Sequence, residues 1–402
     1  MRNLAKEKET YVVKTLMGLE TLLIQELEGL GAEDIKPLLR GASFKGDLKM
    51  LYRANLELRT AIRILKPFWH FQARNEDELY HEVQRINWSQ HLTLKHTFAI
   101  DSVAHSRYFR HSKYAGLKTK DAIVDQFRDR FDKRPNVNTV SPDLRLNVHI
   151  YEDEVNLAYD SSGDSLHMRG YRREVGDAPI NEVLAAGMIM LTGWKGDSLF
   201  IDPMCGSGTL LAEAAMIASN TPAGWNRERF GFQKWKNFNQ KTWDEVLAEA
   251  KAKIKKPSHP ILGFDSDFKT VRMAERNLDT AGMSDYVEIK RMKFQRLEAP
   301  EEKGILITNP PYDERLKEED ILEFYSMIGD QFKQEFKGYE AWLISSNAEA
   351  IKRIGLRASK KIPLQNGAME CRFLKFDLYE GSKKSKYQNL DPESNIASEE
   401  EE

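Results

Sequence analysis

Asparagine, two prolines and a tyrosine follow one another directly after a short apolar run, and their chemistry suits the binding of a planar amine. Residues 304–308 are typical of a buried strand, and Asn309, Pro310, Pro311 and Tyr312 come next. The proline rings fix the direction of the carbonyl before each ring. The Asn309 side-chain oxygen and the Pro310 carbonyl can then accept both N–H groups of an aromatic amine, while Tyr312 stacks on a flipped base. The alternative is a proline-rich loop with Asn309 as a turn residue.

A glycine-rich turn lies earlier in the chain, between the expected strand 199–201 and the expected helix 210–218. Glycines let the backbone approach a ligand closely, and a helix start offers free N–H groups. The turn lacks both the lysine of a phosphate loop and the third glycine of a dinucleotide fingerprint. Asp202 instead suits a cationic group, such as the amino group of S-adenosylmethionine. A plain strand-to-helix turn remains the alternative. The candidate cofactor residues here are Asp202, Cys205, Gly206, Ser207, Gly208 and Thr209.

A second acidic signal follows the next expected strand, residues 261–264. An acid at the end of the second strand of a doubly wound sheet can accept both ribose hydroxyls of a cofactor, which favours Asp265. Asp267 is a second candidate for cofactor binding, although it also suits the N-cap of the following helix.

The elements that position these motifs alternate between strand and helix from about residue 166 onward. Short apolar runs at 198–201, 261–264, 287–290, 304–308 and 341–345 are separated by helical stretches at 208–218, 267–281 and 320–336. This alternation predicts an α/β fold with a doubly wound, mostly parallel sheet. The aromatic-rich stretch 220–243 interrupts the rhythm and predicts an insertion beside the active site.

The preceding part of the chain divides into two further blocks. Residues 1–65 run strand, helix, strand, strand, helix, strand, and residues 66–165 mix helix and strand, with a long amphipathic helix within 113–134. We expect domains at 1–65, 66–165 and 166–380, and a disordered acidic tail at 381–402.

Basic residues gather in the second block without any acid among them, interleaved with three aromatics. Basic side chains supply phosphate contacts and aromatics stack on unpaired bases, so we interpret residues 103–120 as an RNA-binding surface, with a solvated loop as the alternative. A second basic group lies where the second and third blocks join. The candidate RNA-binding residues are Arg107, Arg110, Lys113, Lys118, Lys120, Arg169, Arg172 and Arg173.

Composition narrows the functional classes. The net charge is -2, but residues 391–402 hold six acids and no base, so the remainder carries +4. No apolar run is long enough to span a membrane, and no signal core begins the chain. The chain has two cysteines, which argues against a disulfide scaffold and fits the reducing cytoplasm. Two cysteines also exclude a zinc site made of four cysteines. The histidines lack the spacing of metal ligands. We expect no metal, and a monomer is assumed.

The whole chain to about residue 380 resembles the THUMP-domain class I rRNA methyltransferases of the RlmL-like type. The resemblance rests on the glycine turn, on the Asn309 motif and on residues 166–172, 178–182, 184–186 and 366–371. It implies a ferredoxin-like domain, a THUMP RNA-binding domain and a Rossmann-like catalytic domain. It also implies S-adenosylmethionine as the cofactor and the N2 amino group of a guanine in 23S rRNA as the methyl acceptor.

Some positions depart from the family pattern. Asp313 stands where many relatives have glycine, and 290–295 lacks the acid that holds the cofactor adenine in many relatives, leaving Phe294 to pack on that ring. We expect no counterpart here of the second methyltransferase domain of the larger fusion form. Three alternatives stay open: an N6-adenine methyltransferase on RNA or DNA, a non-catalytic RNA-binding assembly factor and, least favoured, a nicotinamide dehydrogenase.

Overall fold

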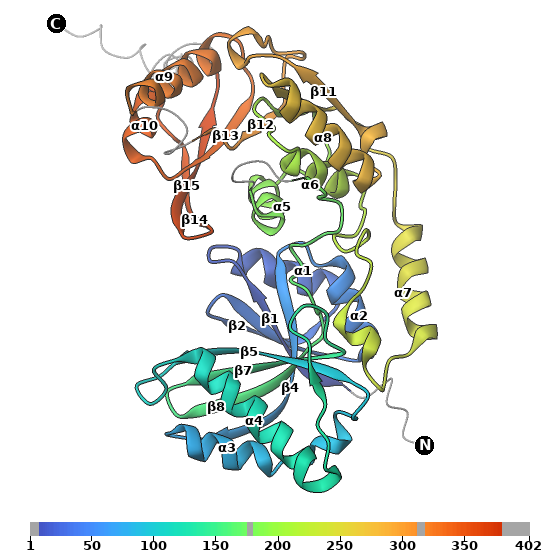
Figure 1. Cartoon of the computed structure of the whole chain (residues 1–402). Coiled ribbons are helices and arrows are strands. Elements are labelled where there is room, and N and C mark those ends of the chain that lie inside the picture. Colours follow the sequence, from blue (N-terminus) through green and yellow to red (C-terminus); the bar gives the residue numbers. More distant parts are fainter. Residues whose placement is uncertain (1–7, 175–179, 312–317, 380–402) are drawn as a thin grey trace, which may run out of the picture. The chain divides into compact units, whose positions relative to one another are not determined.

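The computed structural model of the chain describes residues 8–174, 180–311 and 318–379 (Figure 1). The chain divides into two compact units. The first unit comprises Met1–Arg173, Asn181–Leu191 and Ser219–Lys255, and the second comprises Glu174–Ile180, Thr192–Ala218 and Lys256–Glu402. Two segments that follow residue 166 in the sequence therefore pack with the N-terminal half of the chain.

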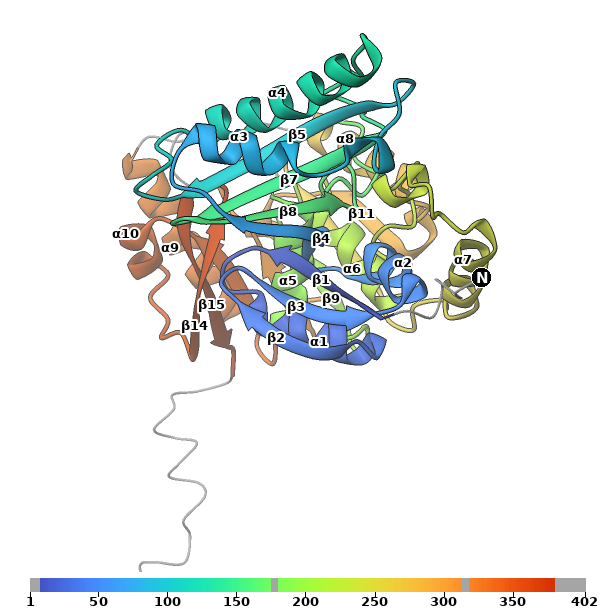
Figure 2. The ribbon, with the colours of Figure 1, turned by 90° about the horizontal axis from the view of Figure 1, so that it is seen from below.

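The first unit is built on one continuous sheet of eight strands in the order β2-β3-β1-β4-β8-β7-β5-β6, and Figure 2 shows the strands from β2 to β5 of this order lying side by side. Its strands are β1 (Glu9–Thr15), β2 (Glu33–Leu38), β3 (Gly41–Gly46), β4 (Ala61–Gln72), β5 (Thr97–His105), β6 (Asn136–Val137), β7 (Leu144–Tyr151) and β8 (Glu154–Asp160). Its helices are α1 (Glu20–Leu30), α2 (Leu48–Glu57), α3 (Glu76–Gln84), α4 (Ser112–Phe131), α5 (Glu182–Thr192) and α7 (Gln240–Ala252).

Strand β4 joins the two halves of this sheet. Its first residues pair with β1, and the residues from Leu65 onward pair with β8, with a register shift between Pro67 and Trp69. The sequence predicts a strand only to Leu65, and the structure extends it through Gln72. One long strand therefore ties the fold of the first block to that of the second.

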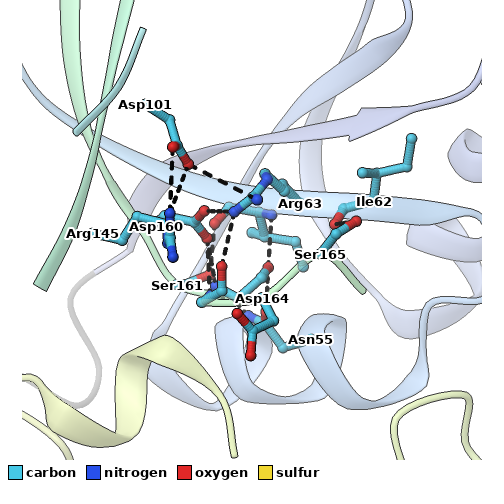
Figure 3. A network of polar contacts seen from close by, with 12 residues as sticks. Asn55, Ile62, Arg63, Asp101, Arg145, Asp160, Ser161, Asp164 and Ser165 are labelled. Carbon is cyan, nitrogen blue, oxygen red and sulfur yellow. Dashed lines mark hydrogen bonds and ion pairs between the residues drawn. The ribbon is translucent and has the colours of Figure 1, made fainter. Parts of the chain in front are cut away.

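A polar network reinforces this junction (Figure 3). Arg63 of β4 contacts the buried carboxylate of Asp160 at the end of β8, and Arg145 of β7 donates to Asp101 of β5 at 3.2 Å. Burial raises the pKa of Asp160, and the charge of Arg63 opposes that rise. The network spans four neighbouring strands, so it fixes the two halves of the sheet against each other.

The aromatic stretch predicted to lie beside the active site contributes to the core of the first unit. Phe232 stacks on Tyr52 of α2 with ring centroids 4.3 Å apart, and Trp243 meets the same tyrosine edge-on. Phe230 and Phe232 are buried with them. The stretch thus supplies apolar surface that covers α2.

The second unit contains a sheet of seven strands in the order β11-β10-β9-β12-β13-β15-β14. The first five run parallel, and β15 and β14 run antiparallel to their neighbours. The strands are β9 (Phe200–Asp202), β10 (Ile261–Asp265), β11 (Val287–Arg291), β12 (Ile305–Thr308), β13 (Glu340–Ser345), β14 (Lys360–Asn366) and β15 (Met369–Asp377). The helices are α6 (Thr209–Ala218), α8 (Phe268–Ala281), α9 (Glu318–Gln334) and α10 (Ala348–Arg353).

The strand order reverses between β9 and β12, because β10 and β11 extend the sheet on one side and β13 on the other. Ligands of open α/β sheets bind at such a switch point, beyond the carboxyl ends of the strands. The glycine turn leaves β9 and the Asn309 motif leaves β12 at this point. The topology alone therefore brings the two predicted motifs together.

The predicted strands and helices of this unit are confirmed with small shifts in their ends. Among the described residues, no helix is both long and apolar enough to cross a membrane. The predicted tail 381–402 lies outside the described residues.

Candidate functional site

The glycine turn begins at Asp202, the last residue of β9, whose side chain is 1% exposed. Its Oδ1 accepts the backbone N–H of Met204 at 3.3 Å. In the part of the chain that the structure describes, no lysine, arginine or histidine pairs with it. Burial, with a contribution from the nearby Asp265, raises the pKa of Asp202 well above its usual value. A cationic group placed against this carboxylate would relieve that penalty.

The turn itself depends on two glycines in the left-handed region, Gly206 at φ +53° and Gly208 at φ +80°. A Cβ on Gly208 would lie 3.1 Å from the Cβ of Ala274, so α6 starts directly against α8. A Cβ on Gly206 would meet nothing within 4 Å. Gly208 is therefore required for helix packing, whereas the open space at Gly206 leaves room for a ligand to approach the backbone.

The remaining turn residues are partly enclosed. The pKa of the Cys205 thiol is raised well above its usual value, mainly by burial, so this thiol is a poor nucleophile. The hydroxyl groups of Ser207 and Thr209 lie 3.4 Å apart. These three side chains line the backbone of the turn and offer no charge of their own.

Asp265 ends β10 and holds the glycine turn from the neighbouring strand. Its Oδ2 accepts the N–H of Gly206 at 3.1 Å, and its Oδ1 accepts the N–H of Asp267 at 3.0 Å. Asp267 is the N-cap of α8, where its carboxylate accepts from the backbone and hydroxyl of Thr270 at 2.8 Å. Those bonds lower the pKa of Asp267. The two acids thus have distinct structural roles.

Asn277 belongs to the same site and escaped the sequence analysis. It is 2% exposed, and its Nδ2 donates to the carbonyl oxygens of Ser207 at 3.0 Å and of Glu174 at 3.2 Å. Its position on the buried face of α8, beside Ala274 and Leu278, was the available signal. A polar side chain on an apolar helix face requires a buried hydrogen-bond partner.

Phe294 lies in the apolar core on one face of the sheet. It is 3% exposed, and its ring centroid lies 5.8 Å from that of Phe336 and 6.0 Å from that of Phe332. Its observed contacts are with α9 and the segment after it, and little of its surface is left for a cofactor ring.

Asn309 and Pro310 follow β12 at the switch point. The Oδ1 atom of Asn309 is buried and has no hydrogen-bond partner among the described residues. Pro310 is buried and Pro311 is half-buried, while Tyr312 and Asp313 lie outside the described residues. A buried acceptor without a donor costs free energy on the order of 1–3 kcal/mol. A bound donor, such as an aromatic amine, would satisfy it.

The predicted RNA-binding residues fall into two groups in the first unit. Arg107, Arg110 and Lys113 are exposed in the loop after β5 and at the start of α4, with Tyr114 beside them, 45% exposed. Arg107 pairs with Glu152 at 3.0 Å, whereas Arg110 and Lys113 have no ion-pair partner among the described residues.

The basic residues further along α4 are more engaged. Lys118 lies 3.5 Å from the Asp77 carboxylate and 5.9 Å from the Tyr114 ring centroid, and Lys120 pairs with Asp121 at 2.7 Å. Among the predicted RNA-binding cations of this group, the exposed ones therefore lie in the loop before α4 and at its first turn.

Arg169 differs from the expectation. Its side chain is 2% exposed and donates to the carbonyl oxygens of Leu166 at 2.9 Å and of Arg59 at 2.6 Å. This burial leaves no surface for the phosphate contact that the sequence suggested, because the guanidinium is consumed by backbone acceptors. Arg172 pairs with the buried Glu182 at 3.2 Å, and Arg173 is exposed.

Comparison with known proteins places three family profiles on the chain. The profile described as the RMKL-like methyltransferase domain matches residues 169–375, a THUMP domain matches 73–160, and the RlmL ferredoxin-like domain matches 10–65. The three-part α/β architecture expected from the sequence is thereby confirmed.

Individual relatives agree with these profiles. A ribosomal RNA large subunit methyltransferase K/L of Syntrophotalea carbinolica is 41% identical over 90% of this chain and 53% of its own length. A Synechocystis protein with the provisional name RNA methyltransferase slr0064 is 38% identical over 92% of this chain and 97% of its own. The chain thus spans about half the length of the relatives named K/L, since the match covers 53% of the Syntrophotalea protein.

A solved structure shares the fold across both units. The SMU.472 protein, provisionally described as a methyltransferase and crystallised with SAH, aligns with a TM-score of 0.82 at 30% sequence identity. The alignment covers 94% of this chain and all of that one.

Proposed function

This chain belongs to the RMKL-like methyltransferase family, and from that premise we propose that it methylates the exocyclic N2 of a guanine in 23S rRNA with S-adenosylmethionine. The names of the K/L relatives support ribosomal RNA of the large subunit as the substrate. The resemblance to RlmL-like enzymes supports N2 of guanine as the acceptor.

The residues of the glycine turn fit this cofactor. The buried Asp202 carboxylate suits the amino group of the methionine part, and the SAH-bound relative SMU.472 supports the same type of ligand. Asp265 already orients the turn through Gly206 and supplies the acceptor that ribose hydroxyls require. When bound, S-adenosylmethionine supplies an electrophilic methyl group.

The buried and unpartnered Oδ1 of Asn309 carries the proposal for the acceptor. An aromatic amine is a weak nucleophile because its lone pair is delocalised into the ring. Two acceptors, Asn309 Oδ1 and the Pro310 carbonyl, bind both N–H groups and direct the lone pair away from themselves. Methylation makes the nitrogen acidic, so the site needs no strong base to release the proton.

The exposed cations at the start of α4 supply the RNA-binding surface in this proposal. Arg107, Arg110 and Lys113 would contact phosphates, and Tyr114 would stack on an unpaired base. Arg173 and the partly exposed Arg172 are candidates for further phosphate contacts, whereas Arg169 is not. Phosphate contacts position the RNA, and the acceptors of the Asn309 motif select the base.

The direct test uses purified protein, isotope-labelled S-adenosylmethionine and 23S rRNA transcribed in vitro. Digestion to nucleosides and mass spectrometry identify the methylated product. We expect labelled N2-methylguanosine. Labelled N6-methyladenosine would favour the adenine alternative, and cofactor binding without any labelled nucleoside from rRNA would contradict the proposed substrate. Failure to bind the cofactor would favour the assembly-factor alternative.

A further inference from the structure

Strand β11 is the first strand of the seven-stranded sheet, so only one of its two edges pairs with another strand. Just beyond it, the N–H of Met292 donates to the carbonyl of Asp265 on β10 at 2.9 Å. Because backbone groups alternate in direction along a strand, those of Val287, Ile289 and Arg291 point away from β10. Within the described ranges, these outward groups have no hydrogen-bond partner. An open edge of this kind can pair with a further strand.

The side chains of β11 match a second, antiparallel copy of the same strand. Glu288 and Lys290 are exposed on one face of the strand and pair with each other at 2.7 Å. A two-fold axis at Ile289 would place Glu288 opposite the partner's Lys290, and Lys290 opposite the partner's Glu288. The same axis makes the two Ile289 residues a directly hydrogen-bonded pair, because the backbone groups of both point outward. One register therefore satisfies the strand edge and both charges.

Helix α8, which packs against this strand, is also complementary in charge to a copy of itself. Its residues at helical spacing i, i+3, i+4 and i+7, which share one side of the helix, are Arg272, Glu275, Arg276 and Asp279. The two-fold axis at Ile289 reverses the direction of α8. It would therefore place Arg272 opposite the partner's Asp279. Likewise, Glu275 would lie opposite the partner's Arg276. Two neighbouring elements thus have self-complementary charges about one axis.

A hollow of about 510 Å³ lies between α8 and the open edge of β11. Leu278, Val287 and Ile289 line it together with the four charged residues of α8. An apolar centre inside a charged rim is the usual anatomy of a protein–protein interface. The four charges of α8 cancel, as do those of Glu288 and Lys290, which disfavours the phosphate backbone of RNA as the occupant. A second copy of this chain fits both the apolar lining and the charges.

We propose that two copies of this chain form a symmetric dimer in which β11 pairs with β11 of the partner about a two-fold axis at Ile289. The pairing joins the two seven-stranded sheets into one continuous sheet. Each contact occurs twice, because a two-fold interface uses the same surface of both copies. This dimer replaces the monomer assumed from the sequence, and it is independent of the base that the chain methylates.

The first test measures the mass of the full chain in solution by light scattering, and we expect twice the mass of one chain for the wild type. Glu288→Lys and Lys290→Glu each place like charges opposite each other at two symmetric positions. Each should therefore raise the dissociation constant of the dimer by about 10- to 100-fold. An equimolar mixture of the two variants restores opposite charges at both positions and should form a mixed dimer. The control Glu349→Lys reverses one charge of an exposed 2.7 Å ion pair on α10 and should leave the dimer unchanged.

A cysteine cross-link tests the register directly. Residues paired at the axis have Cα atoms about 5.5 Å apart, within disulfide reach, so Ile289→Cys should give a linked dimer on oxidation. Val287→Cys should not, because the two copies of that residue lie about 14 Å apart. Both native cysteines are buried and should not interfere. A wild type that stays monomeric up to roughly 100 µM would overturn the proposal. So would equal cross-linking at both positions, or a mixture of the charge variants that stays monomeric although each variant keeps the wild-type unfolding midpoint.

Discussion

The carboxylate of Asp265 holds the amide of Gly206 at 3.1 Å, so the acid expected to bind a ribose already shapes the glycine turn on the neighbouring strand. Its other oxygen accepts from the amide of Asp267 at 3.0 Å. One side chain therefore links the glycine turn to the start of α8.

Replacing this side chain should weaken cofactor binding in two ways. Asp265→Ala removes the acceptor of Gly206 and that of the ribose, so we expect affinity for S-adenosylmethionine to fall about 10- to 100-fold, as for lost hydrogen bonds to a charged group. Calorimetric titration measures the effect. An analogue without ribose hydroxyls should lose less affinity on the same substitution, and an equal loss would argue against the ribose contact.

Asp202→Asn should separate stability from cofactor binding. The folded-state pKa of Asp202 is raised by burial, so its stabilising protonation is present at low pH and is lost as the pH rises through that pKa. The asparagine amide of the variant stays uncharged at every pH, so the variant does not lose stability as the pH rises. Near neutral pH we expect the cofactor-free variant to unfold about 2 to 4 °C above wild type, as for a gain of about 1 kcal/mol.

The same variant should bind S-adenosylmethionine at least 10-fold more weakly, because it has lost the charge that faces the amino group. Thermal unfolding at several pH values and a binding titration make the two measurements. The stability gap between the variant and wild type should shrink as the pH falls. Wild-type affinity in Asp202→Asn would refute the assigned role.

Gly208→Ala should destabilise the second unit more than a change at a matched glycine. Both Gly208 and Gly193 have positive φ angles, +80° and +87°, but a Cβ on Gly193 meets nothing within 4 Å. Gly193→Ala therefore reports backbone strain alone, about 1 kcal/mol. Gly208→Ala adds the clash with Ala274, so its unfolding midpoint should be lower by several degrees. Equal midpoints would show that α6 and α8 can separate freely.

Replacing Arg107, Arg110 and Lys113 together by alanine should weaken RNA binding and flatten its salt dependence. Each lost phosphate contact changes the slope of log K against log salt by about 0.7 to 0.9. We expect the magnitude of the slope to decrease by about 2 to 3 in filter-binding titrations of 23S rRNA. The control variant replaces the exposed Lys241, Lys251 and Lys255 by alanine. An equally large change of slope in this control would contradict the specific role of Arg107, Arg110 and Lys113 in phosphate binding.

Local patterns predicted most of the fold, because apolar periodicity determines where strands and helices form. Gly31 is the left-handed C-cap of α1 at φ +80°, as a glycine directly after an apolar helical run indicates. The extension of β4 through Pro67 escaped prediction, since proline and aromatic residues obscure the alternation there. The pairing of Arg63 with Asp160 joins residues 97 positions apart and leaves no local trace.

The candidate site residues could be predicted because polar side chains directly follow expected strands in short motifs. Asp202, Asp265 and Asn309 end neighbouring strands, so the topology brings them together without any further signal. Arg169 shows the limit of such reasoning. The charge of Arg169 suggested an exposed side chain. Its guanidinium instead donates to the backbone carbonyls of Leu166 and of Arg59, which is distant in the sequence. Tertiary acceptors of this kind are invisible in a sequence.

In the proposed function, Asn309 holds the N2 amino group of a guanine in 23S rRNA, and nucleoside mass spectrometry tests this role in cells. In a strain lacking this gene, N2-methylguanosine in 23S rRNA should fall, and the wild-type gene should restore it. Asn309→Ala should not restore it, although the purified variant binds S-adenosylmethionine normally, because loss of one amine acceptor lowers turnover by about 100- to 1,000-fold. Full restoration by Asn309→Ala, or an unchanged N2-methylguanosine level in the deletion strain, would contradict the claim.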